Sequence, residues 1–304
     1  MQKNGTGSIL LSVTHRNREP APLFAPRHAQ RLAFALLLLA AIIVIAPVIW
    51  IIGVMVKEGA GAMSWQFLTD IPRRGMREGG IGPAIIGTVL LVLGTMVISW
   101  PLGVLAAIYL AEYATPNRFT RLVRLAIVNL AGVPSVVYGL FGLGFFVLFC
   151  RFGSSILSGS LTLAIMSLPV IITASEEALR SVPASFREVS YSLGATRWQA
   201  VRHSVLPYAL PGILTGTILA VSRAAGETAP ILFTVAALYL PRLPHSIFDQ
   251  VMALPYHLYV LSTQVPRVTM ATRYGTALVL LALVLSLNVA AILIRAHFRR
   301  KQRW

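Results

Sequence analysis

Two charged residues, Arg223 and Glu227, interrupt an otherwise apolar run of the chain, ILAVSRAAGETAPILF. A charge at the centre of a bilayer costs about 2.5–3.5 kcal/mol on insertion scales, so such residues usually face the protein interior and serve a function. In a helix the two residues lie one turn apart and can form an ion pair. An arginine can also donate two hydrogen bonds to adjacent oxygens of an anion. We therefore predict a polar gate for an anion at Arg223, Glu227 and Thr228. A purely structural salt bridge between helices is the alternative.

A second group of residues has the spacing of two short, capped helices. Ser185 is followed by Glu188 three residues later, and Thr196 is followed by Gln199 at the same interval. This capping-box spacing satisfies unpaired backbone N–H groups at the start of a helix. Gly194 stands where the first helix would end, a position that favours a residue with positive φ. The predicted helices are residues 186–193 and 197–205.

A stiff pair of helices in a loop would have a mechanical use. A membrane subunit that is driven by a separate motor must present a rigid element to that motor. Two helices joined at a glycine, with their starts capped, form such an element. We therefore predict a coupling loop at residues 176–207. The alternative is a loop that only connects two spans, which would have no need of capped helices.

The elements that position these residues are predicted to be membrane-spanning helices. Of the 304 residues, 56% are hydrophobic and 12% are charged, whereas soluble domains are about 25% charged. A helix needs about 20 apolar residues to cross a bilayer. The long unbroken apolar runs exclude the alternating pattern of a membrane barrel. The fold class is therefore all-α and polytopic, with six spans predicted at residues 33–56, 84–110, 125–150, 161–174, 208–238 and 276–294.

Positive charge is unevenly distributed among the segments that connect these spans. The chain has 26 Lys and Arg against 10 Asp and Glu, a net charge of +16. With the N-terminus inside, 17 positive residues fall on the inner side and 8 on the outer side, and the excess marks the cytoplasm. Both termini are thus predicted to be cytoplasmic. The sequence predicts a partly disordered basic arm at residues 1–32, a periplasmic loop at 57–80 and a basic, lipid-contacting tail at 296–304. This distribution explains the charge without any nucleic-acid partner.

The sequence lacks the motifs of the common enzyme classes. None of the three lysines is followed by Ser or Thr, so there is no Walker A motif. The six histidines have no metal-ligand spacing, and no G-x-S-x-G segment occurs. The single cysteine, Cys150, excludes an intramolecular disulfide. We expect no catalytic residue, metal or cofactor in this chain.

The predicted coupling loop resembles the EAA loop of binding-protein-dependent ABC importer permeases. The resemblance rests on Glu188, on Gly194 six residues later, and on Leu206 and Pro207 after a further twelve. It implies that the loop docks into a groove of an ATPase subunit and couples ATP hydrolysis to movement in the membrane. The coupling residues that it implies are Glu188, Gly194, Ala195, Leu206 and Pro207.

The loop departs from the family pattern at three positions. Val189 and Ser190 stand where the family usually has two alanines, and Ser204 stands where it often has an aliphatic residue. Serine is nearly as small as alanine, so close packing is expected to persist at residue 190.

The segment that contains Arg223, Gly226, Glu227, Thr228 and Ala229-Pro230 resembles the R-x-x-G-E-T-A-P signature of the PstA-type permeases of phosphate importers. The resemblance extends from about residue 80 to the last span and includes the stretches AIYLAEYA at 107–114 and PSVVYGLF at 134–141. It implies a type I, MetI-like permease domain at residues 81–295 that transports inorganic phosphate across the bacterial inner membrane.

The resemblance also implies a set of partners. These are a PstC-like sister permease, two PstB-like subunits that bind ATP and Mg²⁺, and a PstS-like periplasmic phosphate-binding protein. The alternatives are a permease for another oxyanion or polar solute, an ATP-independent channel or secondary transporter, and a membrane scaffold without transport activity.

Overall fold

The structure is a computed structural model that describes residues 26–300, with the side chains of residues 30–298. Two compact units, residues 1–53 and 54–304, are described separately. The predicted arm lies outside the described residues as far as residue 25, and the predicted tail from residue 301. Helix α1 (Pro26–Gly59) begins at Pro26 rather than at residue 33, so the last part of the predicted arm is helical. Proline fits a first turn, where its missing N–H would have no partner anyway.

Within residues 26–300, five helices are long and apolar enough to cross a membrane. These are α1, α3 (Gly82–Ile108), α6 (Ile156–Arg180), α9 (Leu206–Gly226) and α12 (Met270–Arg300). A bent helix pair supplies a sixth span if its two helices are counted together. The predicted helical membrane fold is therefore confirmed.

The third predicted span, residues 125–150, is wrong as a single helix. The segment consists of α4 (Arg118–Ala131), α5 (Ser135–Gly142) and a π-helical continuation, η3 (Leu143–Phe149). The two halves are bent by 102°. Gly132 ends α4, and Pro134 occupies the N-cap of α5. Proline has no N–H and disfavours helical backbone at the residue before it, so one helix cannot run through this point.

The fifth predicted span, residues 208–238, is also interrupted. Helix α9 ends at Gly226, and the short helix α10 (Ala229–Thr234) begins after two non-helical residues. Pro230 lies in the first turn of α10, where it fits; inside a continuous helix its ring would clash with the preceding turn. The sequence had predicted that Glu227 and Arg223 share a helix face. They do not, because the helix ends between them.

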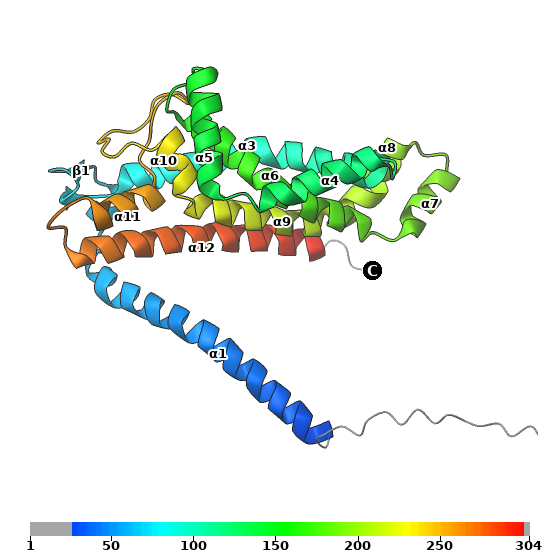
Figure 1. Ribbon diagram of the computed structural model, residues 1–304, viewed down its shortest axis with the longest axis horizontal. Coiled ribbons are helices and arrows are strands. Elements are labelled where there is room, and N and C mark those ends of the chain that lie inside the picture. Colours follow the sequence, from blue (N-terminus) through cyan, green and yellow to red (C-terminus); the bar gives the residue numbers. More distant parts are fainter. Residues whose placement is uncertain (1–25, 301–304) are drawn as a thin grey trace, which may run out of the picture. The chain divides into compact units, whose positions relative to one another are not determined.

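Helix α6 packs against both α3 and α9 in the centre of the unit formed by residues 54–304 (Figure 1). Small residues allow α6 and α9 to approach closely. A Cβ added at Gly212 would lie 2.5 Å from the Cβ of Ala178, and one added at Gly216 would lie 2.4 Å from that of Ala174. Close backbone approach of this kind is a common way to join helices in membranes.

Several short elements occupy the segments on one side of the bundle. They are η1 (Ala60–Ala62), α2 (Trp65–Thr69), β1 (Pro72–Arg73), β2 (Glu78–Gly79) and α11 (Leu254–Thr263). The two strands pair antiparallel. Ser64 caps α2 by accepting a hydrogen bond from the backbone N–H of Phe67. The predicted periplasmic loop at residues 57–80 thus contains local structure of its own.

Three further elements form what we call the coupling elbow, residues 184–205. They are α7 (Ala184–Ser192), α8 (Arg197–Ala200) and a π-helical turn, η4 (Val201–Val205). In Figure 1, α7 and α8 lie at the opposite end of the unit from β1 and α11. The C-terminal part of α12 points to the same end as the coupling elbow, and Arg295 of α12 donates to the hydroxyl of Thr215 in α9.

Candidate functional site

The bend of the coupling elbow is set by local hydrogen bonds around Gly194. The N–H of Gly194 donates to the carbonyl of Tyr191 at 2.9 Å, and the N–H of Ala195 donates to that of Ser190 at 3.0 Å. These two bonds are the pattern of a Schellman motif, which requires a left-handed residue after the helix. Gly194 has a φ of +80°, so the positive φ predicted from the sequence is confirmed.

Only one of the two predicted capping boxes forms. The hydroxyl of Thr196 accepts from the N–H of Gln199, and the side chain of Gln199 accepts from the N–H of Thr196 at 2.8 Å. The box at Ser185 is wrong. Helix α7 starts at Ala184 with Pro183 at its N-cap, so Ser185 lies inside the first turn. Pro183 fixes the start of the helix two residues earlier than the capping pattern indicated.

The second arm of the coupling elbow runs directly into the membrane. Helix α8, the turn η4 and α9 form one continuous segment, Arg197–Gly226, that is long enough to span a bilayer. Leu206 and Pro207 are the first residues of α9 and are partly buried. The π-helical turn η4 stands immediately before them, and such turns accommodate irregular backbone hydrogen bonding. The residues at 206 and 207 thus belong to a span rather than to a linker before it.

The outer surface of the coupling elbow is open to contact. Glu188 and Gly194 are exposed, and Ala195 is half-buried. Leu193 has 83% of its surface exposed, and Trp198 has 46%. Exposed apolar side chains that adjoin a charged one are typical of a surface that meets a protein partner.

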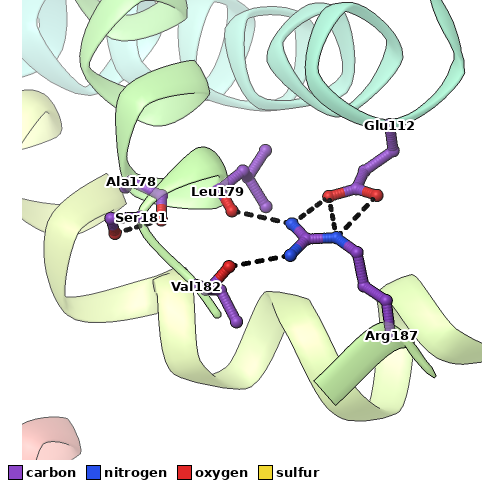
Figure 2. Close-up of polar contacts among 6 residues, drawn as sticks. All are labelled: Glu112, Ala178, Leu179, Ser181, Val182 and Arg187. Atoms are coloured by element: carbon purple, nitrogen blue, oxygen red, sulfur yellow. Dashed lines mark hydrogen bonds and ion pairs between the residues drawn. The ribbon is translucent and has the colours of Figure 1, made fainter. Parts of the chain in front are cut away.

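An ion pair that the sequence did not predict attaches α7 to the bundle (Figure 2). Arg187 donates to the carboxylate of Glu112, with Nη2 at 2.5 Å from Oε1 and Nε at 3.1 and 3.2 Å from the two oxygens. The same guanidinium donates to the carbonyls of Leu179 and Val182 at 2.9 and 2.8 Å. The side chains of Glu112 and Arg187 are 5% and 20% exposed. A sequence signal existed, because Glu112 is the only acidic residue between Glu78 and Glu176.

A second cluster of charges lies near this pair. Glu176 of α6 accepts from Arg124 of α4 at 2.9 Å and from Arg180, one turn along α6, at 2.8 Å. Arg124 also donates to the carbonyl of Leu110 at 2.9 Å. The cluster joins α4 and α6 at the end of the bundle where the coupling elbow lies.

The predicted gate residues lie at the break between α9 and α10. Arg223 is in the last turn of α9, and Glu227 follows with extended backbone, φ −72° and ψ 135°. Their side chains still meet, with Nε of Arg223 at 3.2 Å from Oε1 of Glu227. Arg223 is 38% exposed and Glu227 is 16% exposed. Thr228 follows at the N-cap of α10, and its carbonyl accepts from the N–H of Leu232.

The gate residues and the coupling residues occupy opposite ends of α9. Arg223 lies 17 residues after Leu206 along the helix, which corresponds to about 25 Å at 1.5 Å per residue. Between them, Ser222 donates to Asn288 of α12. One helix, α9, thus connects the coupling elbow to the charge pair.

Comparison with known proteins identifies the family. The family described as binding-protein-dependent transport system inner membrane component matches residues 99–304. The chain is 35% identical over 275 residues to a probable ABC transporter permease protein, YqgI, of Bacillus subtilis, which covers 86% of this chain and 93% of that protein. It is 34% identical over 267 residues to the phosphate transport system permease protein PstA 1 of Mycobacterium tuberculosis, covering 86% of each.

Among solved structures, chains of other ABC transporters share the fold. A chain of the MetNI methionine ABC transporter superposes with a TM-score of 0.56 at 20% identity, over 72% of this chain and 94% of that one. The MetI-like fold predicted from the sequence is thereby confirmed. Permeases of this kind are multi-pass membrane proteins that work with an ATPase and a periplasmic binding protein. This chain belongs to the family of inner membrane components of binding-protein-dependent transport systems.

Proposed function

We propose that this chain is a permease subunit of an ATP-driven importer that carries inorganic phosphate into the cytoplasm. The observation that carries this proposal is the pair of Arg223 and Glu227 at a helix break within a span. The phosphate transport permeases named PstA, such as the M. tuberculosis protein, support phosphate as the transported solute. The same similarity argues against a channel that needs no ATPase.

The helix break supports a polar path at this position. Non-helical backbone is tolerated at membrane depth only where it is buried in protein or lines a water-filled cavity. Glu227 and Thr228 are non-helical, and Arg223 beside them is exposed in this chain. A broken span with an exposed arginine therefore favours a passage that admits an anion.

The ion pair leaves the arginine able to bind an anion. Its hydrogen bond to Glu227 uses Nε, and among the described residues the two Nη groups donate no hydrogen bond. A guanidinium can donate two parallel hydrogen bonds to adjacent phosphate oxygens. Glu227 would orient the guanidinium and, by its own negative charge, keep the anion from binding too tightly to be released.

ATP and Mg²⁺ would be bound by partner subunits. The sequence has no Walker A motif, and the exposed coupling elbow supplies a surface for an ATPase. The partners that we propose are two PstB-like ATPase subunits at the coupling elbow, a PstC-like sister permease that completes the pathway, and a PstS-like periplasmic phosphate-binding protein. ATP binding would favour one of two arrangements of the permeases and so alternate access to the path.

The proposed orientation places both termini in the cytoplasm. The excess of positive residues on the inner segments supports it. The coupling elbow would then face the cytoplasm together with the end of α12, as an ATPase requires.

Stimulation of ATP hydrolysis by the binding protein tests the proposal. The purified complex of this chain, the sister permease and the ATPase is mixed with binding protein that carries phosphate, sulfate or no anion. We expect the phosphate-loaded binding protein to raise the rate of hydrolysis, since only a closed, loaded binding protein should engage the permeases productively. Equal rates with phosphate and sulfate would contradict phosphate specificity, and no stimulation by either would contradict the proposed subunit role.

A further inference from the structure

Both arms of the coupling elbow contact the same short segment at the end of α3. This segment is the π-helical turn η2 (Tyr109–Tyr113), which continues α3. Arg187 of α7 forms the buried ion pair with Glu112. Arg197 of α8 lies over the ring of Tyr113, with its Cζ 5.3 Å from the ring centroid, within the range of a cation–π contact. Two arginines on opposite sides of the Gly194 bend thus meet two consecutive residues.

The covalent chain connects the coupling elbow to α6 and α9 but not to α3. Helix α7 follows α6 after the short turn at residues 181–183, and η4 continues into α9. Glu112 and Arg187 are 75 residues apart in the sequence. Movement of the coupling elbow therefore reaches α3 only through non-covalent contacts.

The ion pair is suited to transmit such a movement. Its two side chains are 5% and 20% exposed, and Arg187 additionally bonds the carbonyls of Leu179 and Val182 at the end of α6 (Figure 2). One guanidinium thus joins α7, the end of α6 and the end of α3. Removing one partner of a buried pair leaves the other charge uncompensated, so this junction resists separation.

The receiving segment has a special backbone. The N–H of Ala114 donates to the carbonyl of Tyr109 at 2.8 Å, five residues earlier, which is the π-helical spacing. Single π-helical turns within α-helices occur frequently at functional sites. Here the turn ends α3 with the two residues that the arginines contact.

We infer that η2, through Glu112 and Tyr113, is the point at which the coupling elbow moves α3, and that Arg187 and Arg197 are positioning residues for this coupling. This inference rests on the proposed function, because it presupposes an ATPase that docks on the coupling elbow. According to this inference, the coupling elbow moves α3 directly. Neither the chain connections nor the coupling motif would indicate such a movement.

Uptake per ATP hydrolysed, measured in proteoliposomes that contain the assembled transporter, tests the inference. We expect Arg187→Gln and Glu112→Gln each to lower this ratio about tenfold or more, because each variant leaves a buried group without its partner. ATP hydrolysis itself should continue. Arg187→Lys keeps the charge but loses the planar fork, so its ratio should be intermediate. Arg180→Gln is the matched control, because Arg180 is 54% exposed and its partner Glu176 keeps Arg124.

A milder variant covers the case in which the buried substitutions prevent assembly. The double variant Tyr113→Leu, Arg197→Gln removes only the half-exposed cation–π contact and should lower the ratio about two- to fivefold, as expected of a contact worth roughly 0.5–1 kcal/mol. The inference would be overturned if the assembled variants kept the unmodified ratio of uptake to ATP hydrolysis, whether both rates were unchanged or both fell equally.

A second readout needs no transported solute. In a Cys150→Ser background, a cysteine introduced at the exposed position Ile86 of α3 is labelled with a maleimide, with and without ATP and vanadate. We expect ATP to change the labelling rate with Arg187 present and not in Arg187→Gln. A rate that ATP does not change, or that changes equally in both, contradicts the inference. Absence of phosphate uptake by the unmodified complex would contradict the proposed function instead.

Discussion

The hydroxyl oxygens of Ser190 and Ser204 lie 2.7 Å apart and join α7 to η4 across the inside of the coupling elbow. Ser190 also donates to the carbonyl of Phe186 at 2.9 Å. A hydroxyl has a single proton, so Ser204 must supply the proton of the bond between the two serines. These residues occupy two of the positions at which the sequence departs from the pattern of the EAA loop. The two departures are thus partners, and together they brace the two arms of the coupling elbow.

Alanine variants should affect the coupling elbow unequally. Ser190→Ala leaves the proton of Ser204 without its acceptor, and we expect a loss of about 1 kcal/mol in stability. Ser204→Ala leaves Ser190 bonded to Phe186 and should cost less. The double variant should be no less stable than Ser190→Ala alone. Protease cleavage rates within residues 181–207 measure these differences, and a larger effect of Ser204→Ala would contradict the assigned direction of the bond.

Substitution of Gly194 should weaken docking of the ATPase and leave membrane insertion intact. No atom lies within 4 Å of a Cβ added at this position, so the cost comes from the backbone. A non-glycine residue with left-handed backbone costs about 1–2 kcal/mol. We expect Gly194→Ala to reduce recovery of the ATPase with the purified permease, and Gly194→Glu to abolish it.

Gly194→Asn is the matched control for these variants. Asparagine tolerates left-handed backbone better than other residues, so ATPase docking should be largely retained. If Gly194→Ala and Gly194→Asn bound the ATPase equally poorly, the loss of docking would come from the presence of a side chain and not from the φ of +80°.

Arg223→Gln should abolish phosphate uptake in an assembled complex. The variant removes the cation that we propose binds the anion, and it leaves the carboxylate of Glu227, 16% exposed, without its partner. Arg74→Gln is the control, since Arg74 and Glu78 form an ion pair with the same spacing, at 2.7 Å, on the exposed segment between β1 and β2. Undiminished uptake in Arg223→Gln would leave the pair with a structural role only.

Acidification should destabilise the segment around α11 through His257. This histidine is 3% exposed, its Nδ1 has no hydrogen-bond partner among the described residues, and burial lowers its pKa to about 4. The unfolded chain, with a pKa near 6.5, takes up the proton first. The stabilisation by neutral His257 is therefore complete above pH 6.5 and is lost as the pH falls towards 4. At pH 5 the loss of stability amounts to about 2 kcal/mol.

The unfolding temperature of the purified protein between pH 7.5 and 5 measures this effect. His257→Leu should flatten the dependence of the unfolding temperature on pH. His245→Leu, at an exposed position, should leave it unchanged. If His257→Leu and the unmodified protein showed the same dependence of the unfolding temperature on pH, other titratable groups would be its cause.

The features that the sequence predicted correctly are those governed by neighbouring residues. The capping box at Thr196 and the left-handed Gly194 depend only on hydrogen bonds within a few residues, and both form. The box at Ser185 failed for a local reason too, because Pro183 displaced the start of α7. The bend at Pro134 was missed because the apolar run that supports a span continues through it.

Long-range contacts could not be predicted from local pattern. Arg187 and Glu112 come together only because α3 and α6 pack side by side. No spacing in the sequence predicts this packing. Glu112 was conspicuous as an isolated acidic residue, but the sequence around it did not indicate which residue it would pair with. For Arg223 and Glu227 the pairing was predicted, whereas the helix end between them was not, because Gly226 is tolerated inside many membrane helices.

ATP-driven uptake of radiolabelled phosphate into proteoliposomes is the most direct test of the central claim. The vesicles contain this chain, the sister permease and the ATPase, and the phosphate-binding protein is supplied on the side opposite the ATPase. We predict accumulation of phosphate that requires both ATP and the binding protein and that persists in excess sulfate. Accumulation without ATP, or its loss in the presence of sulfate, would contradict the account.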